Sequence, residues 1–313
     1  MRIVSFLPSA TELAFALGLG DDLVGVSHEC DYPPAARERP TVVHCAIPLD
    51  GLAPSEIDTA VSTQLGVGGS IYTIDTLLLK ALEPDLILAQ DLCEVCAPSG
   101  NETERALAAL DAKARVLTLA PRSLAEIQEN LRQLGDATGR GDVARTLIAE
   151  QNARVERLRE SLRGATPRRV FFIEWIDPIF CGGHWVPEQI ELAGGVDALA
   201  RKGSDSVRVA FEDVVAWSPE ILVVSPCGAH LDDAAEQAHA MLADDRWLSI
   251  PAVQSGNVFA VDASNYFARP GPRVFDGIEL LAHLFHPERI MAASGFESVN
   301  IRRISRIRTP AVS

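Results

Sequence analysis

The sequence predicts an α/β protein of two lobes, each a parallel sheet flanked by helices, joined by a single long α-helix. The chain has 313 residues, more than one hydrophobic core usually organises, so two lobes are expected. Short apolar runs alternate with longer amphipathic runs, which is typical of parallel strands with helical crossovers. Between two such series, residues 142–162 contain no Gly or Pro and carry apolar residues near helical spacing.

The first lobe is predicted over residues 1–140. We expect strands in its short apolar runs, at residues 3–7, 23–26, 86–89 and 116–119. The amphipathic runs that alternate with them predict helices at residues 11–19, 74–82 and 107–110. This alternation of predicted strands and helices indicates one parallel sheet with helices on its faces.

The connecting helix is predicted over residues 141–165, with a length of about 30 Å. Because a single helical connector is stiff, we expect limited motion of the lobes. The second lobe is predicted over residues 166–290, with strands at 169–173, 221–225 and 258–261. Residues 291–313 lose the periodicity and carry four arginines; we interpret them as a solvated, partly disordered tail in preference to a docking segment.

Charge and hydropathy exclude several classes of partner. The chain carries 28 basic and 43 acidic residues, and its net charge of −15 repels phosphate backbones, so no nucleic acid partner is expected. No apolar run reaches the roughly 18 residues of a membrane span, so the chain is not expected to insert into a membrane. The N-terminal residues read as a buried strand, which predicts a cytoplasmic location, or a periplasmic one if a leader has been removed.

Six segments, in order, resemble the class III periplasmic binding proteins, the solute-binding subunits of bacterial cobalamin and iron-chelate importers. They are SFLPSATELAFALGL at 5–19, GVSHECDYPP at 25–34, LEPDLIL at 82–88, FFIEWIDPIFCGGHWVPEQIELAGG at 171–195, FEDVVAWSPEILVVS at 211–225 and NYFARPGPR at 265–273. The resemblance spans about residues 1–288. It implies two Rossmann-like lobes joined by one long helix, with cobalamin or a related metal chelate held between the lobes, and a binding protein of an ABC-type importer in place of an enzyme.

Ligand-binding residues are predicted in the loops after the strands, because open α/β sheets bind ligands at the carboxyl ends of their strands. The aromatic members of this set supply flat apolar walls for a macrocycle, with packing between the lobes as the alternative. His28 stands where the relatives carry an aromatic contact and is expected to ligate or hydrogen-bond a corrinoid, and Arg269 to meet a phosphate or propionate. The full set is His28, Tyr32, Trp175, His184, Trp185, Tyr266, Phe267 and Arg269.

Cysteines in the same loops raise a second hypothesis, a bound zinc ion or iron–sulfur cluster. Cys93 and Cys96 form a Cys-x-x-Cys pair, and Cys30 and Cys227 are further candidate ligands, because thiolates suit both kinds of centre. The alternative is that these cysteines pack as small buried hydrophobes. If a metal fills the site, the chain is a cytoplasmic metal- or iron–sulfur-binding protein, possibly an enzyme, on the same scaffold.

Two acidic residues are candidates for contact with an ABC permease. By position, the resemblance assigns to Asp75 and Glu212 the carboxylates that pair with arginines of the permease. Their alternative role is that of a carboxylate near the start of a helix, where the helix dipole favours negative charge. No nucleophile elbow, phosphate-binding loop or dinucleotide fingerprint is present, so the sequence itself predicts no catalytic residue.

Overall fold

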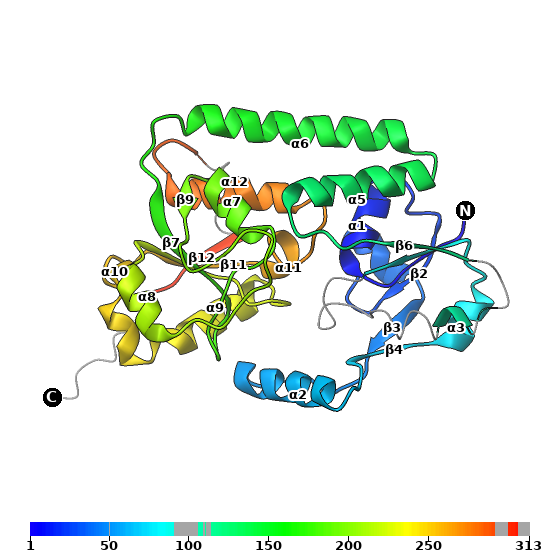
Figure 1. Cartoon of the computed structure of the whole chain (residues 1–313), viewed down its shortest axis with the longest axis horizontal. Helices are drawn as coiled ribbons and strands as arrows, with labels where there is room; N and C mark the ends of the chain where they lie inside the picture. The colour runs from blue at the N-terminus through cyan, green and yellow to red at the C-terminus, as the bar shows by residue number, and fades with distance from the viewer. Residues whose placement is uncertain (50, 91–105, 109, 111–113, 292–299, 306–313) are drawn as a thin grey trace. The chain divides into compact units, whose positions relative to one another are not determined.

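The computed structural model describes residues 1–49, 51–90, 106–108, 110, 114–291 and 300–305 (Figure 1). Contacts divide the chain into two compact units. The first unit consists of residues 1–150 with 270–272, and the second of residues 151–269 with 273–313. Each unit has its own sheet and its own hydrophobic core.

The first unit contains a six-stranded sheet in the order β4-β3-β2-β1-β5-β6. All neighbouring pairs are parallel except β3 and β4, which are antiparallel and close one edge. The central strands β1 and β5 are buried on both faces, as the unbroken apolar runs predict. The strands are β1 (Ile3–Ser5), β2 (Leu23–Ser27), β3 (Thr41–Cys45), β4 (Tyr72–Ile74), β5 (Leu86–Ala89) and β6 (Arg115–Thr118).

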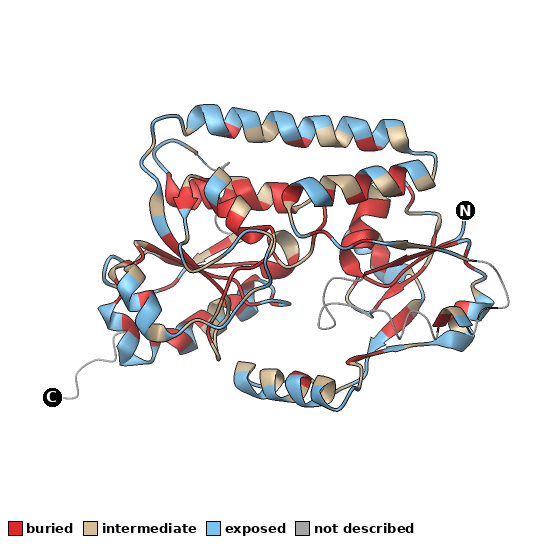
Figure 2. Ribbon diagram, in the orientation of Figure 1, coloured by how far each residue is buried: buried red, intermediate tan, exposed pale blue. Residues whose placement is uncertain are grey.

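Helices cover the sheet of the first unit, and α1 and α5 contact each other (Figure 1). Helix α1 begins at Pro8, which suits a first helical position, and its side chains as far as Ala14 are buried (Figure 2). Helix α5 begins after Ser123, whose hydroxyl oxygen accepts the N–H of Glu126 at 3.2 Å. The helical segments are α1 (Pro8–Ala16), η1 (Pro34–Glu38), α2 (Pro54–Gly66), α3 (Thr76–Ala81) and α5 (Leu124–Ala137).

The second unit contains a sheet in the order β12-β11-β10-β7-β8, with β9 paired to β7. Strands β7, β10 and β11 are parallel neighbours, whereas β12 and β8 pair antiparallel at the two edges. The central strand β10 is buried along its whole length. The strands are β7 (Arg168–Trp175), β8 (Phe180–Cys181), β9 (Gly195–Val196), β10 (Ile221–Val224), β11 (Val258–Val261) and β12 (Ile301–Arg303).

Helices of the second unit pack on both faces of its sheet. One face is covered by α7 and α12, which contact each other, and the core of the other face includes side chains of α9 and η2. Figure 2 shows the buried sheet strands in red. The helices are α7 (Val186–Leu192), α8 (Phe211–Trp217), α9 (Leu231–Leu242), η2 (Asp245–Ser249), α10 (Pro251–Gln254), α11 (Ala263–Tyr266) and α12 (Val274–Phe285).

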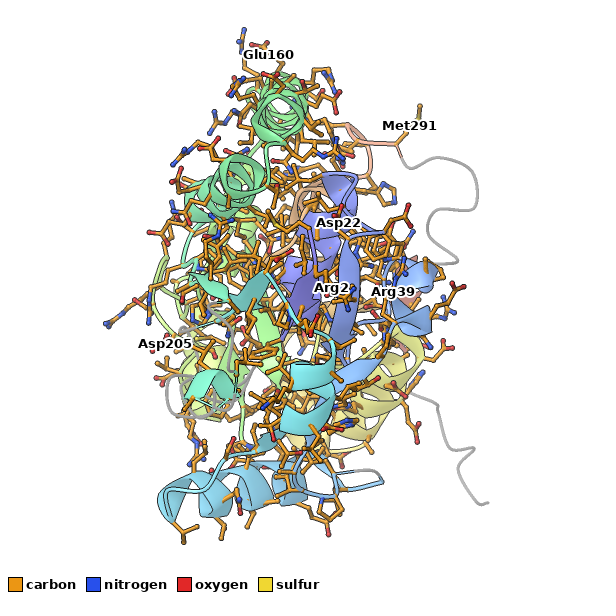
Figure 3. The ribbon with its side chains drawn as sticks, turned by 90° about the vertical axis from the view of Figure 1, so that its right-hand side faces the viewer. Arg2, Asp22, Arg39, Glu160, Asp205 and Met291 are labelled. Atoms are coloured by element: carbon orange, nitrogen blue, oxygen red, sulfur yellow. The ribbon has the colours of Figure 1, made fainter. Side chains whose placement is uncertain are left out.

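The segment predicted as a connector contains helix α6 (Gly141–Ser161), which begins in the first unit and ends in the second. Most of its side chains are exposed, including Glu160, labelled in Figure 3. Within the second unit, the guanidinium of Arg154 holds it to α12 by donating to Glu279 at 2.8 Å and Asp276 at 2.6 Å. That α6 is the single connector between two lobes, with the domain boundaries given above, stays a prediction.

The predicted fold class is confirmed, since the chain is an α/β protein with two largely parallel sheets. The edge strands differ from the expectation of purely parallel sheets, because β4, β8 and β12 run antiparallel. In place of a solvated tail, Ile301–Arg303 forms β12 beside β11. No helix in the parts of the chain that the structure describes is both long enough and apolar enough to span a membrane.

Candidate functional site

Polar and aromatic side chains follow the carboxyl ends of the parallel strands in each unit, where ligands of open α/β sheets bind. In the first unit, His28 comes directly after β2 and is exposed. Its ring Nδ1 lies 3.2 Å from the carbonyl oxygen of Val43. Because a carbonyl only accepts, Nδ1 carries the hydrogen of the neutral ring, and the lone pair lies on Nε2. Tyr32, four residues further on, is also exposed.

Cys30, the one predicted metal ligand of the first unit that the structure describes, gives no support to a metal site. Cys30 is buried against Val26 and Ala36, and its sulfur lies 3.1 Å from the hydroxyl oxygen of Thr11. This is the packing of a small hydrophobe. Cys93 and Cys96 lie outside the described residues, and Cys227 belongs to the second unit, where it is exposed. Within the described parts of the chain, no three His, Cys, Asp or Glu side chains form a group that could hold a metal ion.

In the second unit, the carboxyl end of β7 carries Trp175, which is partly exposed. Its ring N–H donates to the carbonyl oxygen of Asp177 at 3.1 Å, which fixes the indole at the strand end. His184 follows β8 with a positive φ of 52°, a backbone conformation that is uncommon for a residue with a side chain. Its Nε2 lies 3.0 Å from the carboxylate of Asp205, in the geometry of an ion-pair contact and not of an aligned hydrogen bond.

A strap, residues 203–209, lies along the segment that carries His184. The N–H of His184 donates to Ser204 at 2.7 Å, the N–H of Cys181 to Val207 at 3.1 Å, and the N–H of Val209 to Ile179 at 2.9 Å. Figure 3 shows Asp205, a member of this strap, with its side chain at the surface. The strap therefore holds the backbone of His184 in place and also supplies the charged residue next to its ring.

Glu174 joins the strap to β7. Its carboxylate accepts the N–H of Gly183 at 2.8 Å and a hydrogen bond from the Ser206 side chain. Burial raises the pKa of the Glu174 carboxyl above its ordinary range, while these two hydrogen bonds act in the opposite direction. Burial also raises the pKa of the Cys181 thiol, so this cysteine is not an activated nucleophile.

We expect Gly183→Ala to destabilise the second unit by about 1–3 kcal/mol, because overpacking against fixed backbone forces it to move. A Cβ at position 183 would lie 3.0 Å from the carbonyl carbon of Asp205 and closer still to the nitrogen of Ser206. Urea denaturation followed by far-UV circular dichroism measures the change. Gly66→Ala is the matched control, since nothing lies within 4 Å of a Cβ there. Equal midpoints for the two variants would contradict the close packing of the strap.

Two of the predicted macrocycle walls are packed inside the second unit. Trp185 is buried and its ring N–H donates to the carbonyl oxygen of Phe267 at 2.8 Å. Phe267 is buried as well, edge-on to Phe172 with ring centroids 5.2 Å apart. Tyr266 is partly exposed and donates its hydroxyl to Asn300. Packing therefore accounts for Trp185 and Phe267, whereas Tyr266 keeps an accessible surface.

The remaining predicted residues lie as follows. Arg269 is partly exposed, at the point where the chain passes from the second unit to residues 270–272 of the first. Asp75 is exposed and precedes α3, where its carboxylate accepts the N–H of Leu78 at 2.9 Å. Glu212 is exposed in the first turn of α8. Both acidic residues thus have the helix-start placement that the helix dipole favours.

The structure also shows a pair of side chains whose contact sequence reasoning does not predict. His230, in the loop after β10, has its ring Nδ1 3.0 Å from the carboxylate of Asp262, which directly follows β11. The two residues are 32 positions apart, so no local motif joins them. The one signal in the sequence is that each residue follows a buried strand. That β10 and β11 are neighbours becomes clear only once the sheet order is known.

Comparisons with known proteins extend over both units. The vitamin B12-binding protein of Vibrio cholerae is 29% identical over 280 residues, covering 89% of this chain and 86% of that protein. The vitamin B12-binding protein of Vibrio vulnificus is 25% identical over 290 residues, covering 91% and 89%. Among solved structures, the periplasmic vitamin B12-binding protein BtuF of Vibrio cholerae has a TM-score of 0.66 at 27% identity, covering 91% of this chain and 96% of that one.

A periplasmic haem-binding protein from Pseudomonas aeruginosa has a TM-score of 0.71 at 20% identity, with 98% of this chain and 99% of that one covered, and this likeness shows the shared fold. The periplasmic binding protein family matches residues 3–264. Since that match takes in the sheets of both units, from β1 to β11, this chain belongs to the periplasmic binding protein family.

Proposed function

We propose that this chain is the solute-binding protein of an ABC-type importer and that it binds cobalamin or a related metal chelate. The observation that carries this proposal is the similarity to vitamin B12-binding proteins across nine-tenths of the chain. The family consists of binding proteins, so the chain is not an enzyme. We further propose a periplasmic location, as in the family, in preference to the cytoplasmic alternative.

The contacts to the chelate come from strand-end residues whose side chains are accessible. His28 and Tyr32 supply them from the first unit, and Trp175 and Arg269 from the second. His184, whose side chain is only 14% exposed, is the least accessible member of the proposed set. An indole or phenol face packs against the planar part of a macrocycle, and such aromatic contacts add about 0.5–1.5 kcal/mol beyond the area that they bury. The guanidinium of Arg269 suits the phosphate of a nucleotide loop or a propionate.

Delivery to a permease is proposed to use Asp75 and Glu212. Both carboxylates are exposed, and they belong to different units. Exposed acidic groups of this kind mainly speed the encounter with a basic partner surface and fix the orientation in which the two surfaces meet. The carboxylate of Asp75 also caps α3, so its replacement affects the helix as well as any docking contact.

Titration of purified protein with cyanocobalamin by isothermal calorimetry tests the proposal. We expect one cobalamin per chain and a dissociation constant below about 1 μM, equivalent to about 8 kcal/mol. Trp175→Ala is expected to weaken binding up to about tenfold, through loss of an aromatic contact. Leu77→Ala is the control, because this side chain is 82% exposed on α3 and belongs to no strand-end loop.

Absence of heat from cyanocobalamin, with a native circular dichroism spectrum, would contradict the corrinoid assignment. The same titration with ferric haem distinguishes a related chelate from a corrinoid. If Trp175→Ala and Leu77→Ala bound cyanocobalamin with equal affinity, the carboxyl end of β7 would not be part of the contact surface.

A further inference from the structure

Three segments lie side by side at one edge of the second sheet: the end of β7, the short strand β8 and the strap. Trp175 of β7 pairs with Phe180 of β8, and Phe180 forms an antiparallel bridge with Arg208 of the strap. The guanidinium of Arg208 also lies 5.6 Å from the centre of the Phe180 ring. The strap therefore covers the open side of β8, and a single strand separates it from Trp175.

Glu174 lies at an irregularity in the pairing of β7 with β8. Ile173 pairs with Cys181 and Trp175 pairs with Phe180, so two steps along β7 match one step along β8. Glu174 is the extra residue, as in a β-bulge, which interrupts the regular alternation of side chains between the two faces of a sheet. Bulges are frequent beside binding sites, where they re-aim a side chain. The strand pairing alone therefore leaves the end of β7 to be fixed by other contacts.

Contacts of Glu174 supply this fixation from both sides of β7. On the side of β10, its carbonyl oxygen accepts the N–H of Cys227 at 2.9 Å. On the side of β8, its carboxylate accepts the N–H of Gly183 at 2.8 Å and the hydroxyl of Ser206, which belongs to the strap. One side chain thus connects β7, the segment after β8 and the strap.

The strap has the properties of a segment that opens locally. Its backbone is held to the neighbouring segment by a few hydrogen bonds at an edge of the sheet. Most of its side chains are exposed, namely those of Ser204, Asp205, Val207 and Arg208. Segments with few buried contacts open at a lower free energy than the whole protein unfolds. The two hydrogen bonds to the Glu174 carboxylate oppose this opening.

We propose that Glu174 is a positioning residue for chelate binding, because its carboxylate holds the strap closed and so presets the surface that carries Trp175. This inference rests on the proposed function and assigns to Glu174 an effect on affinity without contact to the ligand. A surface that is ordered before binding loses less conformational entropy when the ligand arrives. Opening of the strap lowers the fraction of molecules that are competent to bind, and the apparent affinity falls by that fraction.

Hydrogen exchange of the strap amides, followed by NMR with and without cyanocobalamin, tests this coupling. If only the closed strap binds, ligand at ten times its dissociation constant slows their exchange about tenfold, because binding and closing are linked. A strap that serves the fold alone opens equally in the free and the bound protein. The reporting amides, all outside the proposed contact set, are those of Cys181, Gly203 and Val209.

Ser206→Ala removes one of the two hydrogen bonds to the Glu174 carboxylate. Loss of one hydrogen bond changes an equilibrium constant about two- to tenfold, so the strap amides should exchange faster by that factor. Cyanocobalamin should slow them again. Ser204→Ala is the matched control, because the Ser204 side chain is exposed and lies two positions away on the same strap. It should leave both exchange and affinity unchanged.

Two substitutions of Glu174 separate its hydrogen bonds from its charge. Glu174→Ala removes both bonds, and we expect the affinity for cyanocobalamin to fall about tenfold as the open strap becomes the major form. In Glu174→Gln, the amide oxygen accepts the N–H of Gly183 and the amide nitrogen donates to the hydroxyl of Ser206, which also accepts. Its affinity should therefore stay within about twofold of wild type. A purely electrostatic role would be lost in both variants.

Exchange that cyanocobalamin slows in the wild type and in Ser206→Ala supports the inference, as does affinity lost in Glu174→Ala and kept in Glu174→Gln. Exchange that bound ligand leaves unchanged, or equal exchange in Ser206→Ala and Ser204→Ala, would overturn it and leave the proposed function intact. The serine variants decide the matter even if Glu174→Ala does not fold. If neither cyanocobalamin nor ferric haem bound to the folded wild type, the proposed function would fail and the positioning role with it.

Discussion

Trp247→Ala is expected to lower the free energy of unfolding of the second unit by about 3–5 kcal/mol, the usual cost of removing a buried aromatic side chain. The Trp247 side chain is 1% exposed and belongs to the core on the α9 face of the sheet. Its ring meets Phe211 edge-to-face, with centroids 5.0 Å apart and planes at 78°. Phe211 is the first residue of α8, so the loss of this contact also loosens the start of that helix, although the guanidinium of Arg246 still lies 4.8 Å from the Phe211 ring.

The neighbouring Leu248 provides a matched control, since it belongs to the same short helix and is 44% exposed. Leu248→Ala should change stability by about 0.5 kcal/mol or less. All four tryptophans of the chain lie in residues 151–269, so tryptophan fluorescence during urea denaturation reports the second unit alone. If the two variants had the same midpoint, the packing of Trp247 would not contribute to stability as the structure indicates.

The elements that sequence reasoning places well are the fully buried parallel strands. β5 and β11 coincide with the predicted runs at 86–89 and 258–261, because a strand covered on both faces must be apolar at every position. Edge strands give a weaker signal. The run at 74–82 reads as one amphipathic helix, whereas the structure divides it into the end of β4, the capping residue Asp75 and the shorter helix α3.

Strand β12 shows why the end of the chain escapes prediction. Its three residues contain two arginines, and Arg303 finds its stabilisation in Gly256 and Asn257, to which its guanidinium donates at 2.7 and 3.0 Å. The backbone pairs with β11 through hydrogen bonds that need no apolar pattern. Nothing in the local sequence therefore distinguishes this edge strand from a solvated segment.

The candidate site likewise contains residues that sequence reasoning locates and residues that it misses. The rule that ligands meet the carboxyl ends of parallel strands points from the sequence alone to His28, directly after β2, and to Trp175, the last residue of β7. His184 instead follows the antiparallel strand β8, and the role of all three in binding stays a prediction. The rule cannot tell an accessible aromatic from a buried one: Trp185 follows Trp175 in the same region, yet its ring is packed in the core. Partners such as Asp262 for His230 depend on strand order, which periodicity does not give.

A largely desolvated carboxylate, that of Asp197, makes the stability of the second unit depend on pH. The Asp197 side chain accepts the N–H of Phe172 and the N–H of Leu199, each at 3.0 Å. Burial raises the pKa of its carboxyl from 3.8 to about 6, although hydrogen bonds from backbone N–H groups act in the opposite direction. The folded state therefore holds a proton on Asp197 at pH values at which the unfolded state has released it.

This shift stabilises the folded unit at low pH and the stabilisation is lost as the pH rises. Below about 4 both states are protonated at Asp197, and above about 6 both are ionised, so the change falls between these values. A shift of about two pKa units corresponds to about 3 kcal/mol. Asp197→Asn stays neutral throughout, and the loss of one acceptor oxygen for a backbone N–H gives that variant a cost that does not vary with pH.

We therefore expect the wild-type protein to lose about 3 kcal/mol relative to Asp197→Asn between pH 4 and pH 7. Urea denaturation followed by tryptophan fluorescence at intervals of half a pH unit measures the difference. Other carboxyls, Glu174 among them, also change the free energy of unfolding with pH, and they do so in both proteins. Their contribution cancels in the difference between wild type and variant to the extent that they titrate independently of Asp197. A difference that stays constant from pH 4 to pH 7 would show that hydrogen bonds to the Asp197 carboxylate outweigh its burial; a wild type that gains stability over this range would reverse the sign of the shift.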